Sequence, residues 1–327
     1  ILLYERRFPD GHAYPDHVIG SPEDLQKATL ADVKAFVARH YVPSNASIAI
    51  VGDVDAEKVL ASVERLFGSI TAGEAAATPS RRPVPRATAS RLTLRDDVRL
   101  GRVTFAWHTP PFYEAHDAEL DLLAAILADG RSSRLWRRLM HEEALATEVD
   151  AWQESRQLGS LFCIQVQAAS VADLPRLEDV VREELPRRRS EAVPNAELAR
   201  ARATFLQEMV AVPQRLEDRA EYLNLYFTYL GSPERFAWDL DRYRRVTPAA
   251  LREAASHLLQ PERCFTLTVL PEGKGSPRDV RPKVEAASTF RAPVPETFKL
   301  ENGLEVWLLR RPGLPLVAAR MLMPGGT

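Results

Sequence analysis

Apolar residues along this chain recur in two ways, one typical of helices and one typical of strands. A first helix face is marked by four apolar residues at positions i, i+3, i+4 and i+8, namely Val33, Phe36, Val37 and Tyr41. Thr29 and Asp32 form a capping box before this face, and Pro43 ends the helix. The apolar run 46–51 that follows predicts a buried strand.

The same succession of helix and strand returns near the other end of the chain. Thr247 and Pro261 are 14 positions apart (261 − 247), as are Thr29 and Pro43 (43 − 29). A strand is predicted at 264–270, and the helix face before it consists of Leu251, Ala254, Ala255, Leu258 and Leu259. The tetrapeptide Gly-Ser-Pro-Glu also occurs twice, 211 positions apart (231 − 20). These matches indicate a repeated unit of about 200 residues, the size of a domain.

Between the two copies, the pattern predicts further strands and helices. Strands are expected at 103–107 and 161–167, and helices at 55–67, 116–128, 132–143, 173–185 and 195–228, with Pro213 breaking or kinking the last. This order favours an α+β fold, in which helices pack on one face of a mostly antiparallel sheet. The stretch 76–90, rich in Ala, Thr, Pro and Arg, is a predicted linker, and a second linker is predicted at 273–292.

Composition and charge narrow the class of protein. The 327 residues include 43 Lys and Arg against 45 Asp and Glu, and a net charge of −2 predicts no general attraction to nucleic acid or anionic membranes. No stretch reaches the roughly 18 apolar residues of a membrane span. Cys163 and Cys264 lie in apolar runs as small hydrophobic side chains and form no disulfide framework. Because the chain opens on Ile1 without a leader pattern, the true N-terminus is expected upstream, and bacterial periplasm and cytoplasm are both open as compartments.

The histidines do not form a metal-binding motif. Zinc peptidases need two imidazoles on one helical face, with a carboxylate that activates water. Histidine occurs at positions 12, 17, 40, 108, 116, 141 and 257, so no two are three or four residues apart. His12 and His17 are the closest pair, and because Pro15 predicts a turn between them we interpret both as loop residues.

Other polar clusters have structural interpretations. His141, Glu142 and Glu143 have no second ligand in the sequence and are interpreted as a solvated helix face. The sequence 129–134 is neither a phosphate-binding loop nor the Gly-x-Ser-x-Gly elbow of serine hydrolases. The arginines around the start of the next helix are expected to be exposed or paired with nearby acids: Arg131, Arg134, Arg137 and Arg138.

Several short motifs, taken in order, resemble those of the pitrilysin/insulinase family of zinc metallopeptidases. The segment 11–20, Gly-His-Ala-Tyr-Pro-Asp-His-Val-Ile-Gly, is similar to that family's Gly-His-Pro-Tyr…Val-Ile-Gly segment. Tyr-Val-Pro-Ser-Asn at 41–45 and Val-Gly-Asp-Val-Asp at 51–55 match two further signatures. Gly-Arg-Ser-Ser-Arg-Leu at 130–135 matches a motif of the family's second, non-catalytic domain. The stretch 298–306 resembles the opening strands of another unit.

The resemblance implies a segment of a tandem protein. Residues 1–75 would be the C-terminal part of a first, catalytic-type domain, 91–272 a complete second, non-catalytic domain, and 293–327 the opening strands of a third. In the family, the zinc ligands lie upstream of the segment 11–20, so no catalytic residue and no metal ligand is assigned to this chain. The parent protein is expected to use zinc, to cleave peptides or unfolded proteins and to have its own remaining domains as partners. This portion is expected to bind no zinc, to be inactive alone and to help enclose the peptide chamber.

One departure from the family pattern concerns substrate contacts. Members that contribute them from the non-catalytic domain often carry Arg and Tyr seven residues apart, and here Met140 and Thr147 stand at those positions. Neither supplies a guanidinium or phenol to a peptide carbonyl or a zinc-bound oxyanion. Substrate-binding residues therefore stay unassigned.

Two alternatives to a peptidase segment stay open. One is a non-catalytic scaffold or assembly protein on the same fold, which a degenerate zinc motif upstream would favour. The other is an unrelated α+β binding module, which requires the ordered motifs to be coincidental.

Overall fold

The computed structural model describes residues 2–9, 12–15, 20–74, 88–273 and 294–309, and the chain divides into two compact units, Ile1–Lys274 and Gly275–Thr327. In the second unit, β6 (Glu296–Lys299) and β7 (Glu305–Leu308) form an antiparallel hairpin. Most of the two predicted linkers lies in 75–87 and 274–293, which are outside the described residues. His17 lies in 16–19, which is also outside them.

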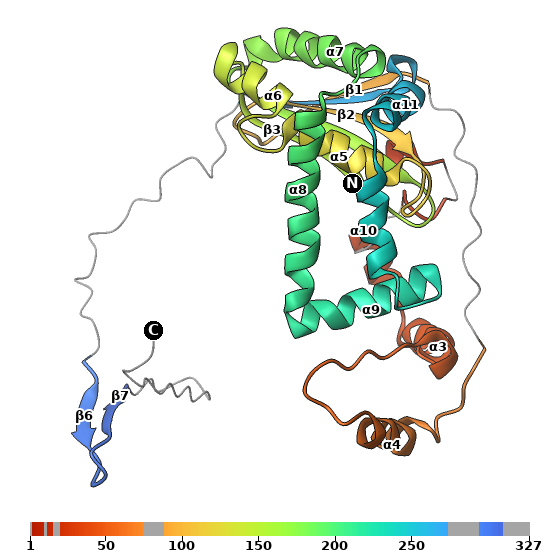
Figure 1. The fold of residues 1–327 in the computed structure, drawn as a ribbon, viewed down its shortest axis with the longest axis vertical. Coiled ribbons are helices and arrows are strands. Elements are labelled where there is room, and N and C mark those ends of the chain that lie inside the picture. Colours follow the sequence, from red (N-terminus) through yellow and green to blue (C-terminus); the bar gives the residue numbers. More distant parts are fainter. Residues whose placement is uncertain (1, 10–11, 16–19, 75–87, 274–293, 310–327) are drawn as a thin grey trace. The chain divides into compact units, whose positions relative to one another are not determined.

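A five-stranded sheet organises the first unit (Figure 1). Its order is β1-β5-β2-β4-β3, and only the β1–β5 pair is parallel. The mostly antiparallel sheet predicted from the sequence is therefore confirmed. The strands are β1 (Ser90–Asp96), β2 (Arg102–Thr109), β3 (Ala146–Glu154), β4 (Ser160–Ala168) and β5 (Phe265–Pro271).

Three helices cover one face of this sheet: α5 (Asp117–Ala128), α7 (Leu174–Ser190) and α11 (Pro248–Leu258). Alternate residues of β2, Val103, Phe105 and Trp107, point into the core beneath them. Burial of each such side chain contributes about 1.5–3 kcal/mol, so this layer is the main source of stability. The predicted helix 132–143 forms as a short helix α6 (Arg134–Trp136) that continues into a π-helical turn (Arg137–Glu142).

The N-terminal residues pack on the opposite face of the sheet. Helix α1 (Leu2–Arg7) leads to Phe8, whose ring is buried against Ala106, Leu161 and Cys163. The hydroxyl of Tyr14 accepts a hydrogen bond from the Leu158 amide at 2.7 Å. Both faces of the central strands are thus covered.

Helices α8, α9 and α10 form a bent helical arm (Figure 1). As predicted, Pro213 breaks the long helix: α8 (Asn195–Ala211) and α9 (Leu216–Leu230) are separated by a 3-10 turn, Val212–Gln214. Gly231 ends α9 with φ of +71°, a conformation that favours glycine. The chain then returns as α10 (Phe236–Arg245). Throughout the described ranges, no helix is long and apolar enough to span a membrane.

The first copy of the repeat forms its helices but not its strand. Helix α3 (Leu30–His40) begins at the predicted capping box, α4 (Ala56–Phe67) forms where a helix is predicted, and a short helix α2 (Pro22–Lys27) precedes them. The strand predicted at 46–51 is wrong: this stretch has no strand in the structure. A strand requires a hydrogen-bonded neighbour, and none of the described residues pairs with it.

The apolar face of α3 differs accordingly from that of its counterpart α11. Val33 is 53% exposed, whereas Leu251 at the matching repeat position is fully buried. The same helix face thus packs on a sheet in one copy and stands uncovered in the other.

Candidate functional site

A cavity of about 970 Å³ lies at the junction of α5, α9 and α10, and the turn between β3 and β4 contributes to its wall. This volume is within the range of small-molecule and peptide side-chain pockets. Its wall combines charged and aromatic side chains, among them Asp117, Asp121, Asp239, Arg242, Tyr222 and Tyr229.

A buried ion triad forms the polar part of the wall. The Arg242 guanidinium donates to Asp117 Oδ2 and to Asp239 Oδ1, each at 2.7 Å. The Ser155 hydroxyl donates to Asp117 Oδ1 at 2.5 Å, and the Tyr226 hydroxyl donates to Asp239 Oδ2 at 3.0 Å. Burial raises the pKa of Asp239, although Arg242 opposes this effect. The hydrogen bonds compensate for removing the charges from water and fix the position of α10 against α5.

Asp121 adds a third carboxyl group, one helical turn after Asp117 on α5. Its Oδ2 accepts a hydrogen bond from the Tyr243 hydroxyl at 2.8 Å. Burial and, second, the Asp117 carboxylate raise the pKa of Asp121 to about 8. Asp121 is therefore mostly protonated at pH 7 and can donate as well as accept a hydrogen bond.

Aromatic rings complete the wall. Phe112 and Tyr229 meet edge to face with centroids 4.5 Å apart, and the Arg242 guanidinium lies 5.1 Å from the Tyr113 ring centroid. Rings of this kind offer rigid apolar surface with polar edges. The cavity can therefore bind a ligand through ring contacts and hydrogen bonds, but within the described parts of the chain no group of three or more His, Cys, Asp or Glu could hold a metal ion.

The two positions singled out from the family pattern lie elsewhere in the fold. Met140, in the π-helical turn, is partly buried against the main core. Thr147, on β3, accepts a hydrogen bond from the Gln167 side chain at 3.1 Å. Neither residue lines the cavity.

His12 and most of the arginines noted in the sequence have structural roles. His12 lies in a loop segment as expected, yet it is buried, with its ring stacked 4.6 Å from that of Phe8. Three of the four arginines noted above pair with acids: Arg134 with Glu184 and Glu197, Arg137 with Glu142, and Arg138 with Glu143 and Glu183.

Sequence reasoning did not predict the cavity residues. Asp117 and Arg242 are 125 positions apart, and nothing in the local pattern relates them. The only available signal was the spacing of Asp239 and Arg242, three residues apart on α10.

Comparison with known proteins places this fold in a family. A family model described as the peptidase M16 inactive domain matches residues 27–205, more than half of the 327-residue chain. The chain belongs to the peptidase M16 inactive-domain family. The resemblance to the pitrilysin/insulinase family is thereby confirmed, and the matching model describes the family's inactive domain.

Relatives of this M16 chain are named as proteases. The zinc protease PqqE of Helicobacter pylori is 26% identical over 235 residues, which are 70% of this chain and 52% of that protein. The chain thus spans about half the length of the curated relatives it matches. The crystal structure of a protease from Helicobacter pylori has a TM-score of 0.71 at 22% identity, covering 80% of this chain and 63% of that one. A peptidase M16 inactive domain from Pseudomonas fluorescens has a TM-score of 0.70 at 21% identity, covering 83% and 64%. These two structures support the α+β fold.

Proposed function

We propose that this chain is the non-catalytic portion of a zinc-dependent endopeptidase and helps to enclose the chamber in which peptides or unfolded proteins are cleaved. The family match carries the proposal, because the inactive-domain model covers residues 27–205, which include α3, α4, the strands β1 to β4, α5, α7 and most of α8. Relatives named as zinc proteases support it, and the chain spans only about half of their length.

The proposal includes a division of the chain. Residues 1–75 are the C-terminal part of a first, catalytic-type domain, 91–272 are the second domain and 293–327 begin a third, with linkers at 76–90 and 273–292. The uncovered face of α3 supports this division, since the matching face of α11 packs on a sheet. A sheet of the first domain would cover α3 in the parent and would supply a neighbour to 46–51.

The proposal assigns no zinc ligand to this chain. The donor set does not fit a zinc site in the ranges that the structure describes, where no three His, Cys, Asp or Glu side chains gather suitably. Zinc would be bound by residues elsewhere in the parent polypeptide. The packing of the partly buried Met140 against the core, and the hydrogen bond that Thr147 accepts from Gln167, support the view that neither binds substrate.

Zinc content and peptide cleavage test this proposal. We expect the purified 327-residue chain to hold no stoichiometric zinc and to leave a fluorogenic peptide intact. We expect a longer polypeptide that includes the upstream region to cleave the peptide and to lose this activity on chelation. Stoichiometric zinc and cleavage by the chain alone would contradict the proposal. A folded longer polypeptide without activity would favour the scaffold alternative.

A further inference from the structure

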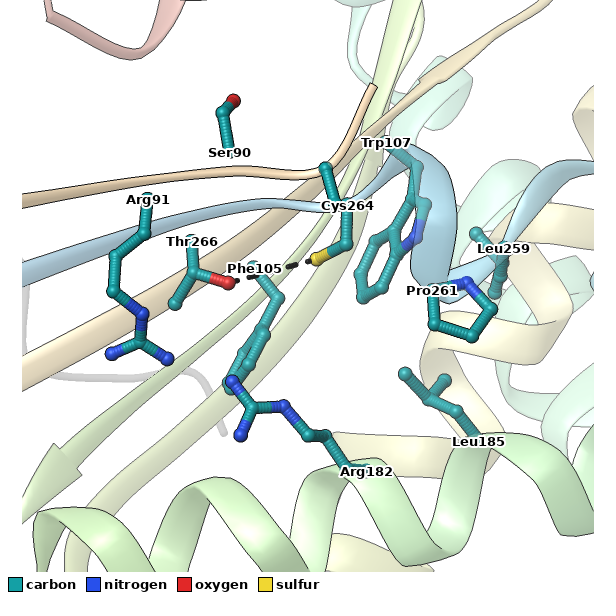
Figure 2. A pocket seen from close by; sticks show the side chains of 11 residues that line it. Ser90, Arg91, Phe105, Trp107, Arg182, Leu185, Leu259, Pro261, Cys264 and Thr266 are labelled. Atoms are coloured by element: carbon teal, nitrogen blue, oxygen red, sulfur yellow. Dashed lines mark hydrogen bonds between the residues drawn. The ribbon is translucent and has the colours of Figure 1, made fainter. Parts of the chain in front are cut away.

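A second cavity lies on the helix-covered side of the sheet, between α7 and the strands β1, β2 and β5 (Figure 2). Its volume is about 450 Å³. Phe105, Trp107 and Leu259, each 1% exposed, form its apolar floor. Leu185 of α7 and Pro261 add apolar wall.

Strand register explains why space is left at this place. Thr266 of β5 is paired with Arg91 on one side and with Phe105 on the other, so the three side chains lie on the same face. Cys264 shares this face two residues earlier. Cys264, just before β5, and Thr266 on β5 have small side chains, whereas Phe105 and Trp107 of the neighbouring β2 are large, and this difference leaves a gap over β5 beneath α7.

The cavity has a cationic rim. Glu178 of α7 accepts hydrogen bonds from Arg91 Nη1 at 2.9 Å and from Arg182 Nη2 at 2.9 Å, and Arg91 Nη2 also contacts this carboxylate. Two guanidinium groups thus share one carboxylate, which leaves one net positive charge. Each guanidinium has five N–H groups, so several donors are still available for a ligand. Figure 2 shows both guanidinium groups on one side of the pocket, away from Leu259 and Pro261.

We propose that this cavity binds a small amphipathic carboxylate. The acid group would pair with Arg91 and Arg182, and the apolar body would lie over Phe105, Trp107 and Leu259. The charge favours an anion over a neutral or cationic molecule of the same shape. At about 30 Å³ per water molecule, the cavity holds about 15 waters, which limits the enclosed part of the ligand to roughly that number of non-hydrogen atoms. The inference goes beyond the proposed peptidase function and does not depend on it.

Such a carboxylate could come from two sources. One is a free medium-chain or aromatic acid, and the other is the free C-terminus of a peptide whose last side chain is apolar. Both present one negative charge beside an apolar group, so the cavity would recognise them through the same contacts. The binding experiment must therefore distinguish the free acid from the peptide C-terminus.

Cys264 provides a reporter inside the cavity. Its sulfur lies 3.9 Å from Thr266 Oγ1 (Figure 2), and burial raises the pKa of its thiol to about 11. Alkylation at mildly alkaline pH is therefore slow but measurable, and an occupied cavity should slow it further. The fully buried Cys163 is the internal reference, and C264S identifies the signal.

Decanoate is the first probe for the 327-residue chain. We expect saturable one-site binding by calorimetry and protection of Cys264 with the same midpoint. Shortening the probe by one methylene should weaken binding about fourfold. Decanol, which has no charge, should bind at least about tenfold more weakly, because hydrogen bonds to charged groups are lost.

Two arginine variants test the role of the rim. Arg182→Gln should weaken decanoate binding about tenfold or more. Arg137→Gln is the matched control, since Arg137 is exposed, pairs with Glu142 and does not line the cavity. It should leave binding unchanged, and thermal unfolding should show both variants folded.

A competition experiment with a peptide distinguishes the two sources of the carboxylate. If acetyl-Ala-Ala-Leu competes with decanoate and its C-terminal amide does not, the site accepts peptide C-termini; if decanoate alone binds, the source is a free acid. Absence of saturable binding, equal binding of decanol, or equal effects of the two arginine variants would overturn the proposal.

Discussion

The two copies of the repeat make a matched pair of substitutions possible. Leu251 and Val33 occupy the same place in their copies (251 − 33 = 247 − 29 = 218), yet the first is fully buried and the second is 53% exposed. Leu251→Ala removes buried methyl and methylene groups and leaves a cavity between α11 and the sheet, which typically costs about 3 kcal/mol. Val33→Ala removes exposed groups and should change the free energy of unfolding by less than about 0.5 kcal/mol.

Urea denaturation followed by tryptophan fluorescence measures this contrast. Trp107 is a suitable probe because it lies in the core, and its indole N–H donates to the Gln260 carbonyl at 3.0 Å, just beyond α11. At an m-value of about 2 kcal/mol/M, we expect Leu251→Ala to lower the midpoint by about 1.5 M and Val33→Ala to leave it nearly unchanged. Equal losses in the two variants, or a loss below about 1 kcal/mol for Leu251→Ala, would refute the reasoning from packing.

Two further predictions concern the cavity at the junction of α5, α9 and α10. Arg242→Met leaves two buried carboxylates without their cation and should cost about 3–5 kcal/mol, whereas the exposed control Arg244→Met should cost at most about 1 kcal/mol in the same urea assay. Asp121 has a pKa of about 8 when folded, against an ordinary value of 3.8, so the folded state retains a proton that the unfolded state has released between these values. Its contribution to stability is therefore lost as pH rises from about 4 to 8. The stability of Asp121→Asn relative to wild type should increase over that range in thermal scans at pH 5 and 8; a constant difference would contradict this assignment.

Local signals predicted the helices well. The Thr29–Asp32 capping box and the break at Pro213 both act within a few residues, and each is present. Strands β2 and β4 were also predicted, since both of their faces are buried and their apolar runs are continuous.

Features that depend on distant neighbours were not predicted. The edge strands β1 and β3 were missed because polar residues such as Arg91 and Asp150 interrupt their apolar pattern. The strand expected at 46–51 has suitable side chains but no neighbour among the described residues. Both cavities arise where elements far apart in sequence meet, so no spacing rule indicates them.

The covering of the second sheet face has a thermodynamic consequence. Phe8 covers Ala106, Leu161 and Cys163, so release of residues 2–9 from the sheet must expose these apolar groups to water. Loss of one buried phenylalanine contact of this kind costs about 1.5–3 kcal/mol. A partner that bound the released segment would therefore bind about tenfold to a hundredfold more weakly, because Phe8 must first leave the sheet. The packing of the N-terminal segment is therefore coupled energetically to the central strands. The solvent accessibility of Cys163 would report whether Phe8 is packed against the sheet.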